Sequence, residues 1–168
     1  LSVVVGGSDD CAMPDPIAGQ GTFAFDNSAA TTGAEGQTEY LCYQFGSSTV
    51  DNDVWFVWTA DATGTAVIET CGLTTIDTKI AGYPDNAGGC PAAGSALDCN
   101  DDTCSLESSI SFACTAASTY TLQVGNFPGA PGSPGSINVS IQTPITNDDC
   151  SAPTALAGQG SFPYTNIG

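Results

Sequence analysis

The chain has 168 residues, enough to bury the core of one full domain. Eighteen acidic residues stand against one basic residue, and the resulting formal net charge of -17 would repel nucleic acid phosphates and anionic membrane surfaces. Histidine is absent while eight cysteines are present, so disulfides fit the composition better than zinc. The composition therefore excludes nucleic acid and membranes as partners and predicts an extracellular or cell-surface protein.

The two ends of the chain resemble parts of neighbouring domains. Residues 1–8 contain a β-branched run without a partner nearby, which we interpret as a closing strand of a preceding copy or a strand donated to a neighbour. Residues 9–146 are predicted to form one complete β-sandwich domain. Residues 147–168 repeat the opening of that domain, since Asp-Asp-Cys recurs with Cys150 placed 139 residues after Cys11. A repeat of this length is domain-sized, so these residues are predicted to open a second copy.

Residues 51–59, which hold both tryptophans, are predicted to form the central strand. Val54, Phe56 and Trp58 fall on one face and Trp55 on the other, so both faces are expected to be covered. No stretch has a convincing helical period, and residues 11–17 are expected to form a turn of helix at most. The remaining strands are predicted from alternation and turn spacing at residues 18–25, 40–45, 64–71, 76–83, 109–114, 120–124 and 137–141.

Together these elements predict an all-β fold. We expect a jelly-roll-like β-sandwich of about eight or nine antiparallel strands, stapled by disulfides. Residues 84–107 form a long Gly-, Pro- and Cys-rich excursion between two of the strands.

Several landmarks occur in the order of a known family. They are Asp-Asn-Asp-Val-Trp-Phe at 51–56, Thr-Cys-Gly at 70–72, Ile-Asp-Thr at 76–78 before Tyr83, Cys-Asn-Asp-Asp at 99–102 before Cys104, and residues 120–125. With them, residues 9–143 resemble secreted bacterial domains of the pre-peptidase C-terminal and collagen-binding-like β-sandwiches. The resemblance implies a calcium-tolerant, non-catalytic module that is usually appended to larger extracellular proteins.

Spacing alone leaves the connectivity of the eight cysteines open. We expect one bond across the long loop, one that ties down the opening segment, and two further bonds. The expected pairs are Cys90 with Cys99, Cys11 with Cys42, Cys71 with Cys104, and Cys114 with Cys150.

Clusters of acidic residues are the candidates for a calcium site, because calcium takes oxygen ligands and needs no imidazole. None of them has the ligand spacing of an EF-hand loop. The alternative is that these side chains cap turns through local backbone hydrogen bonds. The candidates are Asn100, Asp101 and Asp102 between two cysteines, Asp51 and Asp53 at the central strand, and Asp9 and Asp10 at the domain junction.

Lys79 is the only basic side chain, and without histidine any nucleophilic dyad would have to be built on it. Because no pair of carboxylates has a distinctive spacing either, we predict that the protein is not an enzyme. On a predicted strand, Lys79 is expected to be a solvated edge charge. The alternative is an isopeptide crosslink, which would require Lys79 to lie inside the core beside a carboxylate.

Two hypotheses for the function remain. The first is a structural subunit or repeat of a fibre, sheath or stalk, whose copies share strands. The second is a carbohydrate- or protein-binding accessory module of a larger secreted enzyme or adhesin, which should present a row of exposed aromatic side chains. Most aromatics here alternate toward predicted inward positions, so the structural hypothesis is favoured. The residues expected to exchange between copies are Leu1, Val3, Val5, Phe162 and Tyr164.

Overall fold

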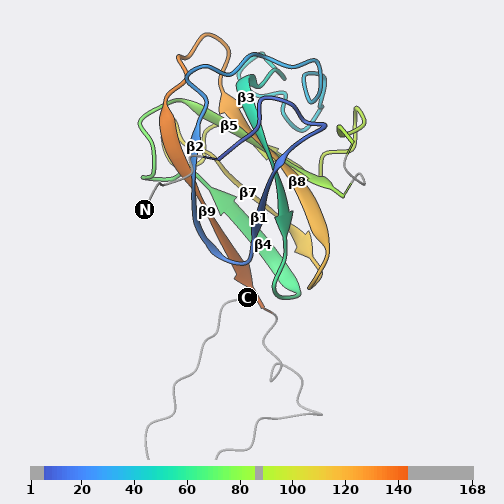
Figure 1. The fold of residues 1–168 in the computed structure, drawn as a ribbon. Coiled ribbons are helices and arrows are strands. Elements are labelled where there is room, and N and C mark those ends of the chain that lie inside the picture. Colours follow the sequence, from blue (N-terminus) through green and yellow to red (C-terminus); the bar gives the residue numbers. More distant parts are fainter. Residues whose placement is uncertain (1–5, 86–88, 144–168) are drawn as a thin grey trace, which may run out of the picture.

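The computed structural model describes residues 6–85 and 89–143, which form two stacked β-sheets (Figure 1). The described part of the chain contains nine strands, and it holds no helix that could span a membrane. The predicted all-β sandwich is confirmed. The strands are β1 (Asp15–Ala18), β2 (Gly21–Asp26), β3 (Asp51–Thr59), β4 (Gly64–Glu69), β5 (Thr78–Pro84), β6 (Asp98–Asn100), β7 (Ser109–Cys114), β8 (Thr119–Asn126) and β9 (Pro134–Gln142).

The two sheets have the orders β1-β3-β8-β5-β6 and β2-β9-β4-β7. Neighbouring strands are antiparallel except for β1, which runs parallel to β3 with Asp15 beside Phe56. The expectation of a helical turn over residues 11–17 is therefore wrong for its second half. Strand β1 is short and contains a proline, features that obscure a strand pattern but suit the edge of a sheet.

Strand β3 is covered on both faces, as its tryptophan pattern predicts. Val54, Phe56 and Trp58 are buried between the sheets, while Trp55 packs against Tyr83 on the other face of the five-stranded sheet. The main core is completed by side chains of the four-stranded sheet that include Phe25, Ile68, Ile110 and Ile137. The second face is covered by loops, and these loops carry the candidate site described below.

The opening segment is hydrogen bonded to this domain. Gly6 N donates to Ala24 O at 3.1 Å, and Ser8 exchanges two backbone hydrogen bonds with Trp55 at 3.1 and 2.8 Å. Residues 6–8 thus connect the two sheets of the sandwich. Residues 1–5 and 147–168, with the predicted exchange residues Leu1, Val3, Val5, Phe162 and Tyr164, lie outside the described residues, so the division into copies stays a prediction.

Three disulfides join distant segments of the described chain. The expected bond Cys71–Cys104 is present, whereas Cys11 is bonded to Cys90 and Cys42 to Cys99. The expected pairs Cys11–Cys42 and Cys90–Cys99 are wrong because Cys99 lies in β6, which pairs with β5 and places Cys99 under the loop that contains Cys42. Cys114 is buried at the end of β7, and its expected partner Cys150 lies beyond the described range.

Candidate functional site

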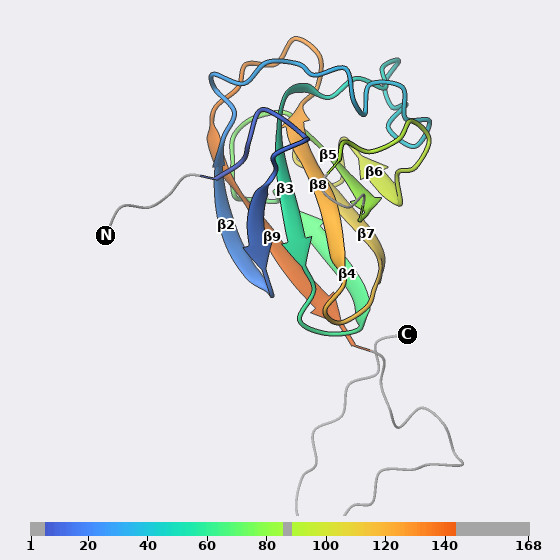
Figure 2. The same cartoon turned by 45° about the vertical axis from the view of Figure 1, so that its right-hand side comes forward.

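A loop at one end of the sandwich carries four exposed apolar side chains. Residues 39–47, here called the aromatic loop, precede β3 and lie beside the segment that leads into β6 (Figure 2). Tyr40 is 86% exposed, Tyr43 63% and Phe45 71%, and Leu41 is also exposed. These aromatics do not face inward as the sequence predicts.

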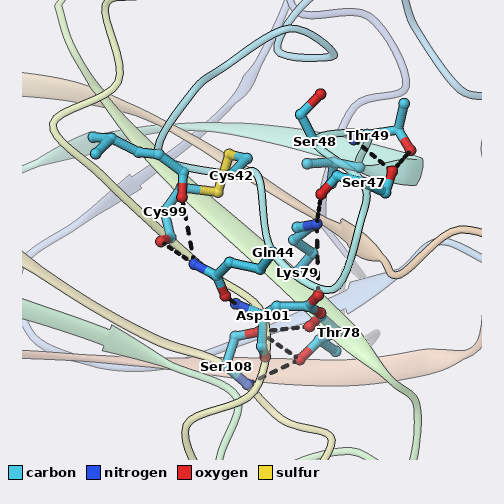
Figure 3. A network of polar contacts seen from close by, with 12 residues as sticks. Cys42, Gln44, Ser47, Ser48, Thr49, Thr78, Lys79, Cys99, Asp101 and Ser108 are labelled. Atoms are coloured by element: carbon cyan, nitrogen blue, oxygen red, sulfur yellow. Dashed lines mark hydrogen bonds and ion pairs between the residues drawn. A yellow bond between two sulfur atoms is a disulfide. The ribbon is translucent and has the colours of Figure 1, made fainter.

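The aromatic loop is fixed by its buried residues. Cys42 is fully buried in its disulfide with Cys99. The buried Glu39 carboxylate accepts hydrogen bonds from Gly94 N at 2.7 Å and Ala96 N at 3.4 Å. The Gln44 amide donates to Cys99 O at 3.1 Å (Figure 3). The loop therefore presents its aromatic side chains from a backbone that is already ordered.

Turn geometry explains why residues 40–45 do not form the predicted strand. Tyr43 N donates to Tyr40 O at 3.0 Å, and Gln44 and Ser47 exchange backbone hydrogen bonds at 3.0 Å. Phe45 and Gly46 between them have φ angles of +49° and +90°. Such angles close a tight turn, and Gly46 is the sequence signal that could have indicated it.

Lys79 lies beneath the aromatic loop rather than at a solvated edge. It sits in β5, which is flanked by β8 and β6, and it is fully buried. Its Nζ donates to Ser47 O at 3.0 Å and lies 3.5 Å from Asp101 Oδ2 (Figure 3). The Phe127 ring centroid is 5.4 Å from the same nitrogen. The expectation of an edge charge is wrong because β6, too short to be recognised in the sequence, covers this edge.

Three carboxylates surround the lysine. Asp77, Asp101 and Asp102 each place an oxygen within 4.8 Å of the others, and Asp101 is only 1% exposed. Burial raises the pKa of Asp101 to about 6; Lys79 opposes the rise, and Asp102 and Asp77 add to it. Burial likewise raises the pKa of Asp77 and lowers that of Lys79. The uncharged forms of Asp101, Asp77 and Lys79 are therefore easier to reach than they are in water.

The predicted calcium ligands near this cluster have protein partners. The Asn100 side-chain oxygen accepts hydrogen bonds from Thr103 Oγ1 at 2.7 Å and Ser109 N at 3.0 Å. The Lys79 ammonium lies beside Asp101, one of the expected calcium ligands, and Asp102 remains exposed. Asp77, which is not among the predicted ligands, completes the cluster.

The other predicted calcium ligands tie loops together. Asp53 is buried and accepts hydrogen bonds from Gly33 N at 3.0 Å and Gln123 Nε2 at 2.9 Å. Asp9 accepts from Thr31 N at 2.6 Å, and Asp10 accepts from Ala12 N at 2.9 Å. Asp51 pairs with Asn126 at the start of β3. Asp10 also lies near Cys11 and Cys90, but both sulfurs are used in a disulfide. Calcium binding by any of these residues stays a prediction.

No family model matches the chain, and the comparison with curated proteins gives no significant match. Among solved structures, the chain is similar to the crystal structure of Aeromonas hydrophila PliG, a periplasmic lysozyme inhibitor of g-type lysozyme. Its sequence is 18% identical, the TM-score is 0.45, and the match covers 77% of this chain and 98% of that chain. A similarity of this size carries no conclusion about the function of this chain.

Proposed function

We propose that this chain is a non-catalytic, extracellular binding module that holds a protein partner on its aromatic loop. The observation that carries the proposal is the exposure of Tyr40, Tyr43 and Phe45 on one disulfide-anchored loop. Aromatic side chains are enriched in protein interfaces and dominate their binding energy. A loop that is ordered before binding also loses little conformational entropy on association.

Charge indicates the kind of partner. With a net charge of -17 the module attracts a basic protein surface over a long range and repels acidic ones. The charge and the aromatic side chains affect different rate constants of binding. The electrostatic part sets the association rate and weakens with salt, whereas the aromatic contacts set the dissociation rate.

Site-specific photocrosslinking tests the proposal. A photoreactive benzoylphenylalanine replaces Tyr43 or, as a control, the exposed Ala116. Ala116 lies in the turn between β7 and β8, at the opposite end of the sandwich from the aromatic loop. Each protein is irradiated in the extracellular fraction of its source. We expect a discrete protein adduct from position 43 and none from position 116.

Competition distinguishes a specific partner from adventitious capture. Excess wild-type protein should abolish the adduct, and excess Tyr40→Ser/Phe45→Ser protein should not. Equal competition by the two proteins would contradict the proposal, as would the absence of any adduct. An adduct whose added mass is removed by glycosidases and yields no partner peptides would replace the protein partner by a polysaccharide.

A groove at the open edge of the sandwich favours the fibre hypothesis as a second candidate. Strands β1 and β2 each end their sheet, and a groove of about 540 Å³ between them is lined by Ile17, Phe23 and Phe56. Because Ala24 O accepts from Gly6 N, the free side of β2 already pairs in parallel with the chain at one end of this groove. A strand from another copy could extend that pairing.

Sedimentation velocity over a range of concentrations tests the second candidate. The full chain should form larger species as its concentration rises, and a chain without residues 151–168 should remain a monomer. A monomeric full chain at high concentration would contradict strand sharing.

A further inference from the structure

Lys79 is buried, so its charge does not serve to keep the protein soluble. It is the only lysine or arginine among 168 residues, and it is fully buried. An isolated charge is costly to bury, and a solitary ion pair rarely repays the loss of hydration. Burying Lys79 therefore costs free energy of folding that an apolar side chain at this position would not cost.

The amine of Lys79 and the carboxylate of Asp101 lie beside each other in the core. Nζ lies 3.5 Å from Oδ2 of Asp101, a carboxylate that accepts no hydrogen bond from the described residues at either oxygen. Asp77 lies immediately before β5 and two residues from Lys79, and its carboxylate acts electrostatically on the Lys79 ammonium. Its Oδ1 is also buried without a hydrogen-bond partner in the described chain.

We propose that Lys79 Nζ and Asp101 Cγ become joined by an intramolecular isopeptide bond, with Asp77 as the proton-transfer group. This bond would connect strand β5 to the turn that follows β6. It lies directly beneath the aromatic loop, because Asp101 N donates to Gln44 Oε1 at 2.8 Å and Lys79 Nζ donates to Ser47 O.

The reaction is a condensation and needs no oxidant or cofactor. A proton first passes from the Lys79 ammonium to the Asp101 carboxylate, which leaves an amine and a carboxylic acid. The Nζ lone pair then forms a bond to Cγ. The Asp77 carboxylate takes a proton from the nitrogen and delivers it to the departing hydroxyl, so the Cγ–O bond breaks and water leaves. The product is one amide and one water, and Asp77 returns to its starting state.

The environment favours this proton transfer. Burial lowers the pKa of Lys79 and raises the pKa of Asp101, so the uncharged pair is easier to reach than it is in water. The Phe127 ring covers the amine on one side. Holding the two groups in contact also replaces a bimolecular amide formation by an intramolecular one.

Two measurements on the full chain test the proposal. The first is the intact mass after reduction and denaturation, which should be lower than the sequence mass by one water molecule. The second uses trypsin, whose single cleavage site in this sequence follows Lys79. Acylation of Nζ removes that site, so the denatured, reduced wild-type chain should remain uncut. A wild-type chain of full mass that trypsin divides into two pieces would overturn the proposal.

Three variants locate the bond. Asp101→Ala should have its full sequence mass and be cut, and Asp77→Asn should remain largely uncrosslinked. Asp102→Asn is the matched control, since Asp102 belongs to the same cluster but is exposed, and it should crosslink like the wild type. Both readouts use denatured protein and report whether the bond formed earlier in the folded chain. A circular dichroism spectrum like that of the wild type, recorded before denaturation, must therefore show that each uncrosslinked variant folds. A water loss that persists in Asp101→Ala would place the dehydration elsewhere and overturn this assignment.

Discussion

Cys42 is bonded to Cys99, with Cα atoms 5.0 Å apart, and this disulfide ties the aromatic loop to strand β6. Gln44 makes a parallel connection, because its amide reaches Cys99 O on one side and Asp101 N on the other. The loop is thus anchored to the same short strand whose following turn contacts Lys79. Binding by the loop and the integrity of the buried cluster are therefore expected to be coupled.

Removing this disulfide should affect both stability and binding. We expect Cys42→Ala/Cys99→Ala to lose about 2–4 kcal/mol of unfolding free energy in denaturant titrations and to bind the crosslinked partner more weakly. Cys71→Ala/Cys104→Ala is the control, since its disulfide also closes a long loop but does not hold the aromatic residues. This control should lose similar stability and keep its affinity. Equal loss of affinity in both variants would show that the loop is not specifically anchored by Cys42.

Substitutions at two glycines with positive φ angles distinguish the cost of backbone strain from the cost of a steric clash. Gly36 and Gly46 have φ angles of +74° and +90°, but only at Gly36 would a Cβ meet other atoms, the Gln123 amide and the Tyr83 hydroxyl. Gly46→Ala should cost about 1–2 kcal/mol from the left-handed backbone alone. Gly36→Ala should cost clearly more, because it also breaks the hydrogen bond between Tyr83 and Gln123. Equal costs in denaturant titrations would contradict the packing of residues 33–37 on the sheet.

Two aspartates should give opposite dependences of stability on pH. Burial raises the pKa of Asp53 above its ordinary 3.8, against the opposing hydrogen bonds from Gly33 and Gln123. The folded state then holds the Asp53 proton more tightly, so its contribution is fully present below pH 3.8 and is lost as the pH rises through the raised pKa. Relative to wild type, Asp53→Asn should therefore gain stability as the pH rises from 3.8.

Asp26 provides the matched control. Hydrogen bonds from Ser28 lower the pKa of this exposed carboxylate, so its contribution is present above the ordinary value and is lost as the pH falls through the lowered one. Relative to wild type, Asp26→Asn should lose stability as the pH rises through that range. Melting temperatures measured at several pH values check both trends, and parallel curves for the two variants would contradict the assigned environments.

The regular strands could be predicted from the sequence, and the site could not. The alternation of Val54, Phe56 and Trp58 reports burial directly, because period-2 patterning arises from the strand itself. The same reasoning fails at Tyr40 and Phe45, where a long-range disulfide and two residues with positive φ override a strand-like alternation.

Lys79 shows a second limit of the sequence. Its exposure depends on which strands flank β5, and β6 has only three residues, fewer than a hydrophobic pattern needs to be recognised. The proximity of Lys79 to Asp101 likewise follows from the pairing of Ile80 with Asn100, which no local signal encodes. The resemblance to pre-peptidase C-terminal domains stays a prediction.

The affinity of matched variants for the captured partner tests the binding account most directly. Tyr43→Ser/Phe45→Ser should weaken binding at least about tenfold, because interface aromatics of this kind contribute about 2 kcal/mol or more. Ala116→Ser, at the opposite end of the sandwich, should bind like the wild type. Titration calorimetry at constant salt gives both values. Unchanged affinity in the aromatic variant, with its fold intact, would contradict the account.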